Sequence, residues 1–151
     1  MEKELLNSDK ELLLKDLCAR LPYGVKVGTT DNDGSLENVW DTLWFNIFTE
    51  DVKLTHSIED ADKIIDISET KPYLFPLSSM TEEQREEFLN IQTEERQILL
   101  NALIEYKSGK YDKIPIIAPY KQIEWLNKNH FDYRGLIERG LAIDCTNLNI
   151  Y

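Results

Sequence analysis

The chain has 151 residues, of which 42% are hydrophobic and 30% are charged, and its formal net charge at pH 7 is −11. This length and composition predict one soluble globular domain over residues 1–151, and the lack of an apolar run of about 18 residues argues against a membrane span. The negative charge disfavours nucleic-acid binding and favours basic protein partners.

The start of the chain and its cysteine content indicate a reducing compartment. The segment MEKELLNSDKELLLKDL alternates charge with leucine and lacks the basic start and apolar core of a signal peptide. Cys18 and Cys145 are too few for a disulfide scaffold or a zinc site. We therefore expect a cytoplasmic protein with buried, reduced cysteines and with no metal or cofactor.

The first predicted helix covers Ser8–Ala19. Ser8 and Glu11 match a capping box, and Pro22 and Gly24 end the helix. Four apolar side chains fall on one predicted face: Leu13, Leu14, Leu17 and Cys18.

Short strands are predicted to follow. Gly24–Gly28 and Ile64–Ile67 are strand candidates, and Asp31–Gly34 is predicted to be a turn. Between them, aromatic and β-branched residues favour two strands, Asn38–Phe48 and Val52–His56, which complete an antiparallel meander with the first strand. A helix over Val39–Phe48 remains open, because several apolar residues there also sit at helical spacing: Val39, Trp40, Leu43, Trp44 and Ile47.

The second half of the chain is predicted to be mainly helical. Lys71–Pro76 must be extended, because each proline disfavours helix in the residue before it. Thr81 and Gln84 form a capping box for a helix that reaches Tyr106, with or without a break near Gln92.

The remaining elements are short. Ile114–Ala118 suits an edge strand or connector, and Lys121–Asn129 and Tyr133–Arg139 are predicted as two helices, with Gly140 as a stop. The fold class is therefore predicted to be α+β, with an N-terminal helix, a small antiparallel β-sheet and a helical C-terminal half.

Residues 31–70 form an acidic block, with eleven carboxylates against two lysines and hence a net charge of −9. Trp40, Trp44, Phe45 and Phe48 are interleaved with the carboxylates, so the block is not a plain acidic tail. Surface carboxylates steer basic partners, and tryptophans supply buried anchors at interfaces. We predict partner-binding residues here: Asp41, Trp44, Glu50, Asp51, Glu59, Asp60 and Asp62. A solvated acidic face is the structural alternative.

The C-terminal aromatic segment is a second candidate surface, with Trp125, Phe131 and Tyr133 as its partner-binding residues. They suit either a core or a docking surface. The same segment can be read as a helix-turn-helix with Arg134 and Arg139 on its second helix. A DNA-binding helix needs a row of lysine and arginine residues to neutralise phosphates, however. Basic residues are few in this segment and alternate with acidic ones, so sequence-specific DNA binding is not predicted.

Catalytic and metal-binding patterns are weak in this sequence. Alignment of Asp31–Gly34 with a calcium loop leaves the first and twelfth ligand positions without carboxylates. His56 and His130 lie at no metal-ligand spacing from another histidine or cysteine. A cysteine–histidine pair formed in space has no local support. No motif brings a nucleophile, a base and an oxyanion donor together, so an enzyme is not predicted and a hydrolase ranks last.

Three phrases of the sequence carry a family resemblance: Asp16–Val25, Lys71–Glu83 and Trp125–Ala142. Together they resemble a group of small uncharacterised proteins encoded by phages and prophages of Bacteroidetes-type bacteria. The phrases cover about a quarter of the chain, and their order and spacing extend the resemblance over nearly all of it. The resemblance implies a phage or prophage product that acts in the bacterial cytoplasm, but it supplies no activity and no site residues.

These observations predict a small acidic binding protein that inhibits or modulates a bacterial nucleic-acid enzyme. Defence nucleases, CRISPR effectors among them, have basic channels in which carboxylates can replace phosphates. The alternative is a phage accessory or assembly protein that docks through its C-terminal aromatic segment.

Overall fold

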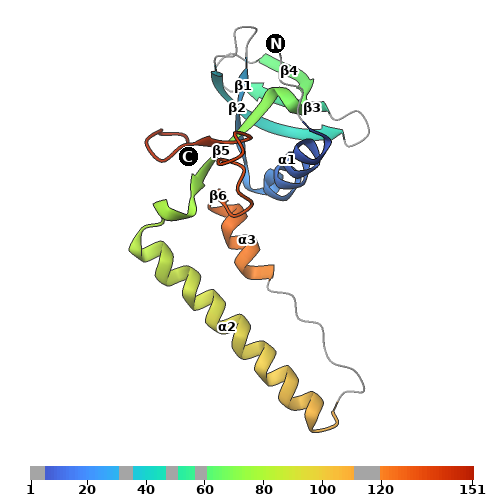
Figure 1. Ribbon diagram of the computed structural model, residues 1–151, viewed down its shortest axis with the longest axis vertical. Coiled ribbons are helices and arrows are strands. Elements are labelled where there is room, and N and C mark those ends of the chain that lie inside the picture. Colours follow the sequence, from blue (N-terminus) through green and yellow to red (C-terminus); the bar gives the residue numbers. More distant parts are fainter. Residues whose placement is uncertain (1–5, 31–35, 47–50, 57–60, 111–119) are drawn as a thin grey trace. The chain divides into compact units, whose positions relative to one another are not determined.

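The computed structural model describes residues 6–30, 36–46, 51–56, 61–110 and 120–151 (Figure 1). The sequence predicts a single domain over residues 1–151. The chain forms two compact units within these residues. The sheet unit comprises Met1–Ser79 with His130–Tyr151, and the helical unit comprises Met80–Asn129. The predicted α+β class is confirmed, since an N-terminal helix and a mostly antiparallel sheet precede further helices.

The sheet unit begins with helix α1 (Asn7–Arg20), which the 3₁₀ turn η1 (Leu21–Tyr23) follows. Its strands are β1 (Lys26–Thr30), β2 (Leu36–Asn46), β3 (Asp51–His56), β4 (Ala61–Asp66), β5 (Thr70–Pro76), β6 (Phe131–Asp132) and β7 (Ile143–Asp144). The strand order is β4-β3-β2-β1-β5-β6, with β7 also paired to β5. Neighbours from β4 to β5 are antiparallel, whereas β6 and β7 run parallel to β5. The predicted meander is confirmed, and the helical alternative for Val39–Phe48 is wrong where the structure describes that segment.

The core of the sheet unit lies between α1 and one face of the sheet (Figure 1). Strand alternation is clear in β3, where Val52 and Leu54 are fully buried while Asp51 and Lys53 are only half-buried. The buried cluster joins α1, the strands and the C-terminal segment: Leu13, Leu17, Val25, Val27, Trp40, Val52, Leu54, Ile65, Ile67, Leu74, Leu136, Leu141 and Ala142.

Two details of the first helix were predicted wrongly. The capping residue is Leu6, which makes no side-chain cap, so Ser8 lies inside α1 and does not begin a capping box. Cys18 is exposed, because the buried face carries Leu13, Asp16, Leu17 and Arg20. Gly24 closes η1 with a left-handed φ of 69°, which explains why β1 starts only at Lys26.

The helix predicted over Tyr133–Arg139 does not form. The Asp132 carboxylate accepts the N–H groups of Leu136 and Ile137 at 3.0 and 2.8 Å, and Gly135 has a left-handed φ of 73°. A single turn results. It closes at Gly140, also at φ 73°, as Leu141 N–H donates to the Leu136 carbonyl. Gly140 is the predicted stop, but the helix-turn-helix interpretation loses its second helix.

The helical unit contains α2 (Glu82–Lys107) and α3 (Tyr120–Lys128). The predicted capping box is confirmed: Thr81 N–H donates to Gln84 Oε1 at 2.9 Å, and Gln84 N–H donates to Thr81 Oγ1 at 3.2 Å. Helix α2 has no break near Gln92. The predicted turn Asp31–Gly34 and the predicted edge segment Ile114–Ala118 lie outside the described residues.

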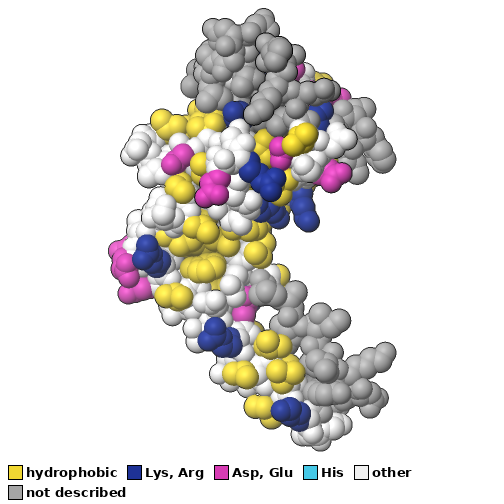
Figure 2. Space-filling model, viewed as in Figure 1, with side chains coloured by type: hydrophobic (Ala, Val, Ile, Leu, Met, Phe, Trp, Pro, Cys, Tyr) yellow, Lys and Arg dark blue, Asp and Glu magenta, His cyan; other side chains and the backbone are white. Residues whose placement is uncertain are grey.

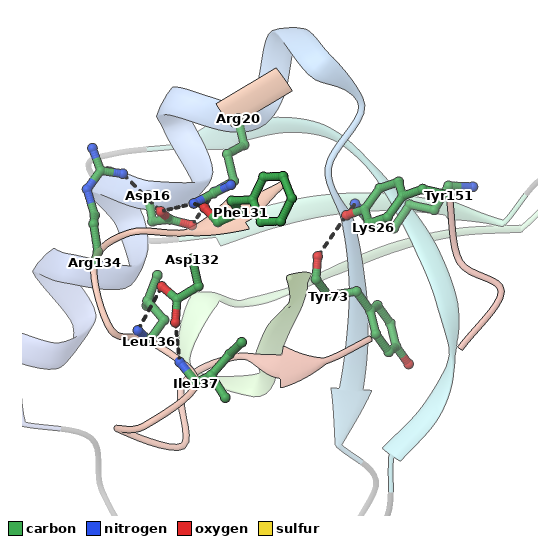
Figure 3. A network of polar contacts seen from close by, with 10 residues as sticks. All are labelled: Asp16, Arg20, Lys26, Tyr73, Phe131, Asp132, Arg134, Leu136, Ile137 and Tyr151. Atoms are coloured by element: carbon green, nitrogen blue, oxygen red, sulfur yellow. Dashed lines mark hydrogen bonds and ion pairs between the residues drawn. The ribbon is translucent and has the colours of Figure 1, made fainter. Parts of the chain in front are cut away.

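A buried ion pair connects α1 to the C-terminal part of the sheet unit (Figure 3). Asp16 and Arg20 are fully buried, and Arg20 Nε donates to Asp16 Oδ2 at 2.8 Å. Arg20 Nη2 also donates to the Phe131 carbonyl at 2.7 Å, and Arg134 Nη1 lies 2.9 Å from Asp16 Oδ1. One carboxylate therefore holds two guanidinium groups from distant parts of the sequence.

Replacement of Asp16 by alanine is expected to lower the free energy of unfolding by about 3–5 kcal/mol, because Arg20 would keep a buried charge without its carboxylate partner. Asp9→Ala is a matched control on the same helix: Asp9 pairs with the exposed Arg139 at 3.0 Å, and such pairs contribute less than about 1 kcal/mol. Urea denaturation followed by circular dichroism measures both variants. Equal losses would contradict the role assigned to Asp16.

Candidate functional site

The strand register places three of the predicted binding residues on one face of the meander. Asp41 lies opposite Lys26, Trp44 lies opposite Lys53, and Asp51 is in the same strand as Lys53, two residues away. Directly opposed side chains of an antiparallel pair share a face, and this face points away from the core residues Val52 and Leu54. We call it the outer face and define it by seven residues: Lys26, Asp41, Trp44, Asp51, Lys53, Ile64 and Asp66.

A register shift between Thr42 and Trp44 makes this arrangement possible. Simple alternation would place Asp41 and Trp44, three residues apart, on opposite faces of β2. The shift behaves as a β-bulge, which adds a residue to one strand and re-aims the side chains that follow. No sequence signal for the bulge was recognised.

A row of three residues, two apolar with a lysine between them, crosses the centre of the outer face. The register aligns Trp44 of β2, Lys53 of β3 and Ile64 of β4. Trp44 is 39% exposed and Ile64 is 59% exposed, whereas Trp40 on the inner face is only 8% exposed. The outer face therefore presents an aromatic and an aliphatic side chain that the fold does not bury.

Carboxylates flank this row. Asp41 lies 3.5 Å from Lys26, and Asp51 stands directly opposite Asp66 in the β3–β4 register. Burial raises the pKa of Asp66, but hydrogen bonds from the Ser68 hydroxyl and N–H, with the charge of Lys10, outweigh burial and hold this pKa below its usual value. Like charges directly opposed destabilise a sheet, but the Asp66 carboxylate has compensating partners, since it caps the turn at Ile67–Glu69 through Ser68 and lies 3.9 Å from Lys10.

The other predicted acidic residues are less well placed. Glu50, Glu59 and Asp60 lie outside the described residues, and Asp62 pairs with Thr55 in the β3–β4 ladder, with its side chain outside the described part. Their contribution to the outer face stays a prediction.

The predicted aromatic residues of the C-terminal segment are mostly interior. In the helical unit Trp125 is 6% exposed, and its ring centroid lies 5.5 Å from that of Phe88. In the sheet unit Phe131 is 1% exposed, and the half-buried Tyr133 ring has the Arg134 and Arg20 guanidinium carbons at 4.6 and 5.4 Å from its centroid. These positions suit packing better than docking.

Helix α2 exposes further apolar side chains, which lie along the lower part of the view in Figure 2. Leu89, Ile98, Leu99, Leu100 and Ile104 are all exposed. Helices with apolar residues on several sides usually have a partner. Nothing among the described residues shows what covers this part of α2.

Neither cysteine is an activated nucleophile. Burial raises the pKa of the Cys145 thiol to about 11 and also raises the pKa of Cys18, so neither forms a thiolate readily at neutral pH. Within the described ranges, no three His, Cys, Asp or Glu side chains gather as a metal site requires. The side chain of His56 lies outside the described part.

Comparisons with protein-family models, with curated proteins and with solved structures give no match to this chain. Among the helices that the structure describes, none combines the length and the apolar character of a membrane span.

Trp40 and Trp44 are expected to differ in their contribution to stability. Trp40→Ala removes a buried ring and should cost about 3–5 kcal/mol, whereas Trp44→Ala removes a partly exposed ring and should cost less than about 2 kcal/mol. Urea unfolding of the two variants measures the difference. If Trp44→Ala is as destabilising as Trp40→Ala, Trp44 belongs to the core and is not a surface anchor.

Proposed function

We propose that this protein is a phage- or prophage-encoded binding protein that inhibits or modulates a bacterial nucleic-acid enzyme through the outer face. The observation that carries the proposal is the exposure of Trp44 on a face that also holds Asp41 and Asp51. A half-exposed tryptophan is a typical interface anchor, because it buries a large rigid surface on binding.

Charge selects the partner in this proposal. The chain carries −11 overall, and the acidic block contributes most of this charge. The segments that connect the meander strands contain Asp31, Asp33, Glu50, Glu59 and Asp60. Such a charge distribution accelerates association with a basic surface and repels nucleic acid itself.

A nuclease channel is the kind of basic surface that suits this combination. Channels that bind phosphates depend on Lys and Arg, and carboxylates on a folded surface can pair with the same groups. A CRISPR effector is one candidate within this class. The place of action would be the bacterial cytoplasm, in keeping with the phage resemblance.

The alternative, an accessory or assembly protein docking through the C-terminal aromatic segment, has weaker support. Trp125 and Phe131 are buried, and Tyr133 packs against Arg20 and Arg134. Docking through these side chains would first require their release.

A pull-down from bacterial lysate, with elution in rising salt and identification by mass spectrometry, tests the proposal. The wild-type chain should retain a nucleic-acid enzyme that moderate salt releases, and the double variant Trp44→Ala/Asp51→Lys should bind this enzyme at least about tenfold more weakly. Glu138→Lys, an exposed charge reversal in the turn near the C-terminus, is the matched control and should bind normally.

Two results would contradict the proposal. One is unchanged affinity and unchanged salt dependence of the enzyme for the double variant. The other is capture of a phage structural protein that resists high salt and is lost on Tyr133→Ala, which would favour the alternative.

A further inference from the structure

Strand β5 changes partners at Pro72, and a side chain from the C-terminal segment occupies the junction. β1 pairs with Thr70–Pro72, after which β5 pairs with β7 and β6. Continuation of the β1–β5 register would place Lys26 opposite Tyr73. Instead, the Tyr151 hydroxyl lies between these two residues: Lys26 N–H donates to it at 3.1 Å, and it donates to the Tyr73 carbonyl at 2.9 Å (Figure 3).

His130 supports the Tyr151 ring from one side. The two rings are stacked, with centroids 3.7 Å apart and planes inclined by 8°. Within the described ranges His130 is the single non-glycine residue with positive φ, at 59°. It is 7% exposed, and its Nδ1 atom has no hydrogen-bond partner in the described part of the chain. A left-handed histidine with an unsatisfied buried nitrogen is strained in two ways.

The surroundings of His130 oppose a positive charge on its ring. Burial, together with the charges of Arg20 on α1 and Lys26 on β1, lowers the pKa of His130 to about 4. The Asp16 carboxylate that pairs with Arg20 is also shared with Arg134. Burial raises the pKa of Tyr151, so the phenol stays neutral and keeps its donor proton.

The segment that carries Tyr151 has few other attachments. At its base, Thr146 N–H donates to the Asp144 carboxylate at 2.9 Å, and Leu148 N–H donates to the Cys145 carbonyl at 2.9 Å. Residues 146–149 are exposed. Apart from His130, the Tyr151 ring approaches Phe75 at 6.1 Å between centroids. Segments with so few buried contacts open at low free-energy cost.

We propose that residues 146–151 are a releasable strap, in which Tyr151 closes the junction between β1 and β5 and protonation of His130 opens it. Protonation of His130 adds a positive charge that the charges of Arg20 and Lys26 oppose, and it leaves the Nδ1–H without an acceptor. The strap can relieve this cost by moving the stacked Tyr151 ring away, which exposes the imidazolium to water. The closed strap binds fewer protons than the open strap. Its stability is therefore complete above about pH 6.5, the ordinary pKa of histidine, and decreases as the pH falls toward 4. The proposal does not depend on which partner the outer face binds.

Amide hydrogen exchange of the full chain, measured by NMR, tests the strap, because the Lys26 N–H reports the Tyr151 bridge directly. Protection of Lys26, corrected for the intrinsic exchange rate, should decrease by up to about tenfold per pH unit between pH 6.5 and 4.5. The Leu54 amide, in the centre of the meander, should keep its protection and serves as the internal reference for global unfolding.

Two variants separate the strap from simple acid unfolding. His130→Asn removes the titrating group but tolerates the left-handed conformation, so the protection of Lys26, whatever its level without the stacked ring, should be the same at both pH values. Tyr151→Phe keeps the stacked ring but lacks the bridging hydroxyl, so Lys26 should exchange rapidly at both. The proposal is overturned if Lys26 stays protected in the wild type at pH 4.5, if His130→Asn shows the same loss, or if Leu54 loses protection in parallel.

Discussion

The buried carboxylate of Asp16 connects helix α1 to the C-terminal segment of the sheet unit. It is fully buried, it pairs with Arg20 one helical turn further along α1, and it also holds Arg134. Through Arg20 the same pair reaches the backbone of Phe131, 111 residues away in the sequence. Charges removed from water are tolerated only when each has a partner, so α1 and the returning C-terminal segment must form together.

Local sequence signals predicted much of the fold. Prolines fixed Lys71–Pro76 as extended, and the Thr81–Gln84 capping box located the start of α2. Non-local interactions decided the rest. Tyr133–Arg139 has a helical composition, but the carboxylate of Asp132 takes the N–H groups that a helix would use. The burial of Asp16 and Arg20 is indicated by the sequence, because both residues lie at helical spacing from Leu13 and Leu17 and therefore on the apolar face of α1.

The candidate site shows the same division between composition and geometry. Composition identified the acidic block and its tryptophans, but it could not separate the buried Trp40 from the exposed Trp44, because both are aromatic residues of one strand. The register shift at Thr42/Trp44 makes the distinction, and it depends on pairing between strands. Only the strand register shows that Lys26 and Lys53 lie among the carboxylates of the outer face, where they reduce its net charge, and that Lys53 lies between Trp44 and Ile64.

Lys26 links the outer face to the strap, because side chain and backbone of a strand residue point in different directions. Its side chain stands on the outer face beside Asp41, while its N–H lies in the sheet and bonds to Tyr151. If both proposals hold, a basic partner that engages Asp41 adds positive charge beside Lys26, whose own charge already lowers the pKa of His130, and protonation of His130 becomes less favourable. Linkage then requires the reverse effect as well: acidification that opens the strap must weaken binding of the partner by the same free energy. Under these two proposals, proton binding at His130 and protein binding at the outer face would oppose each other through Lys26.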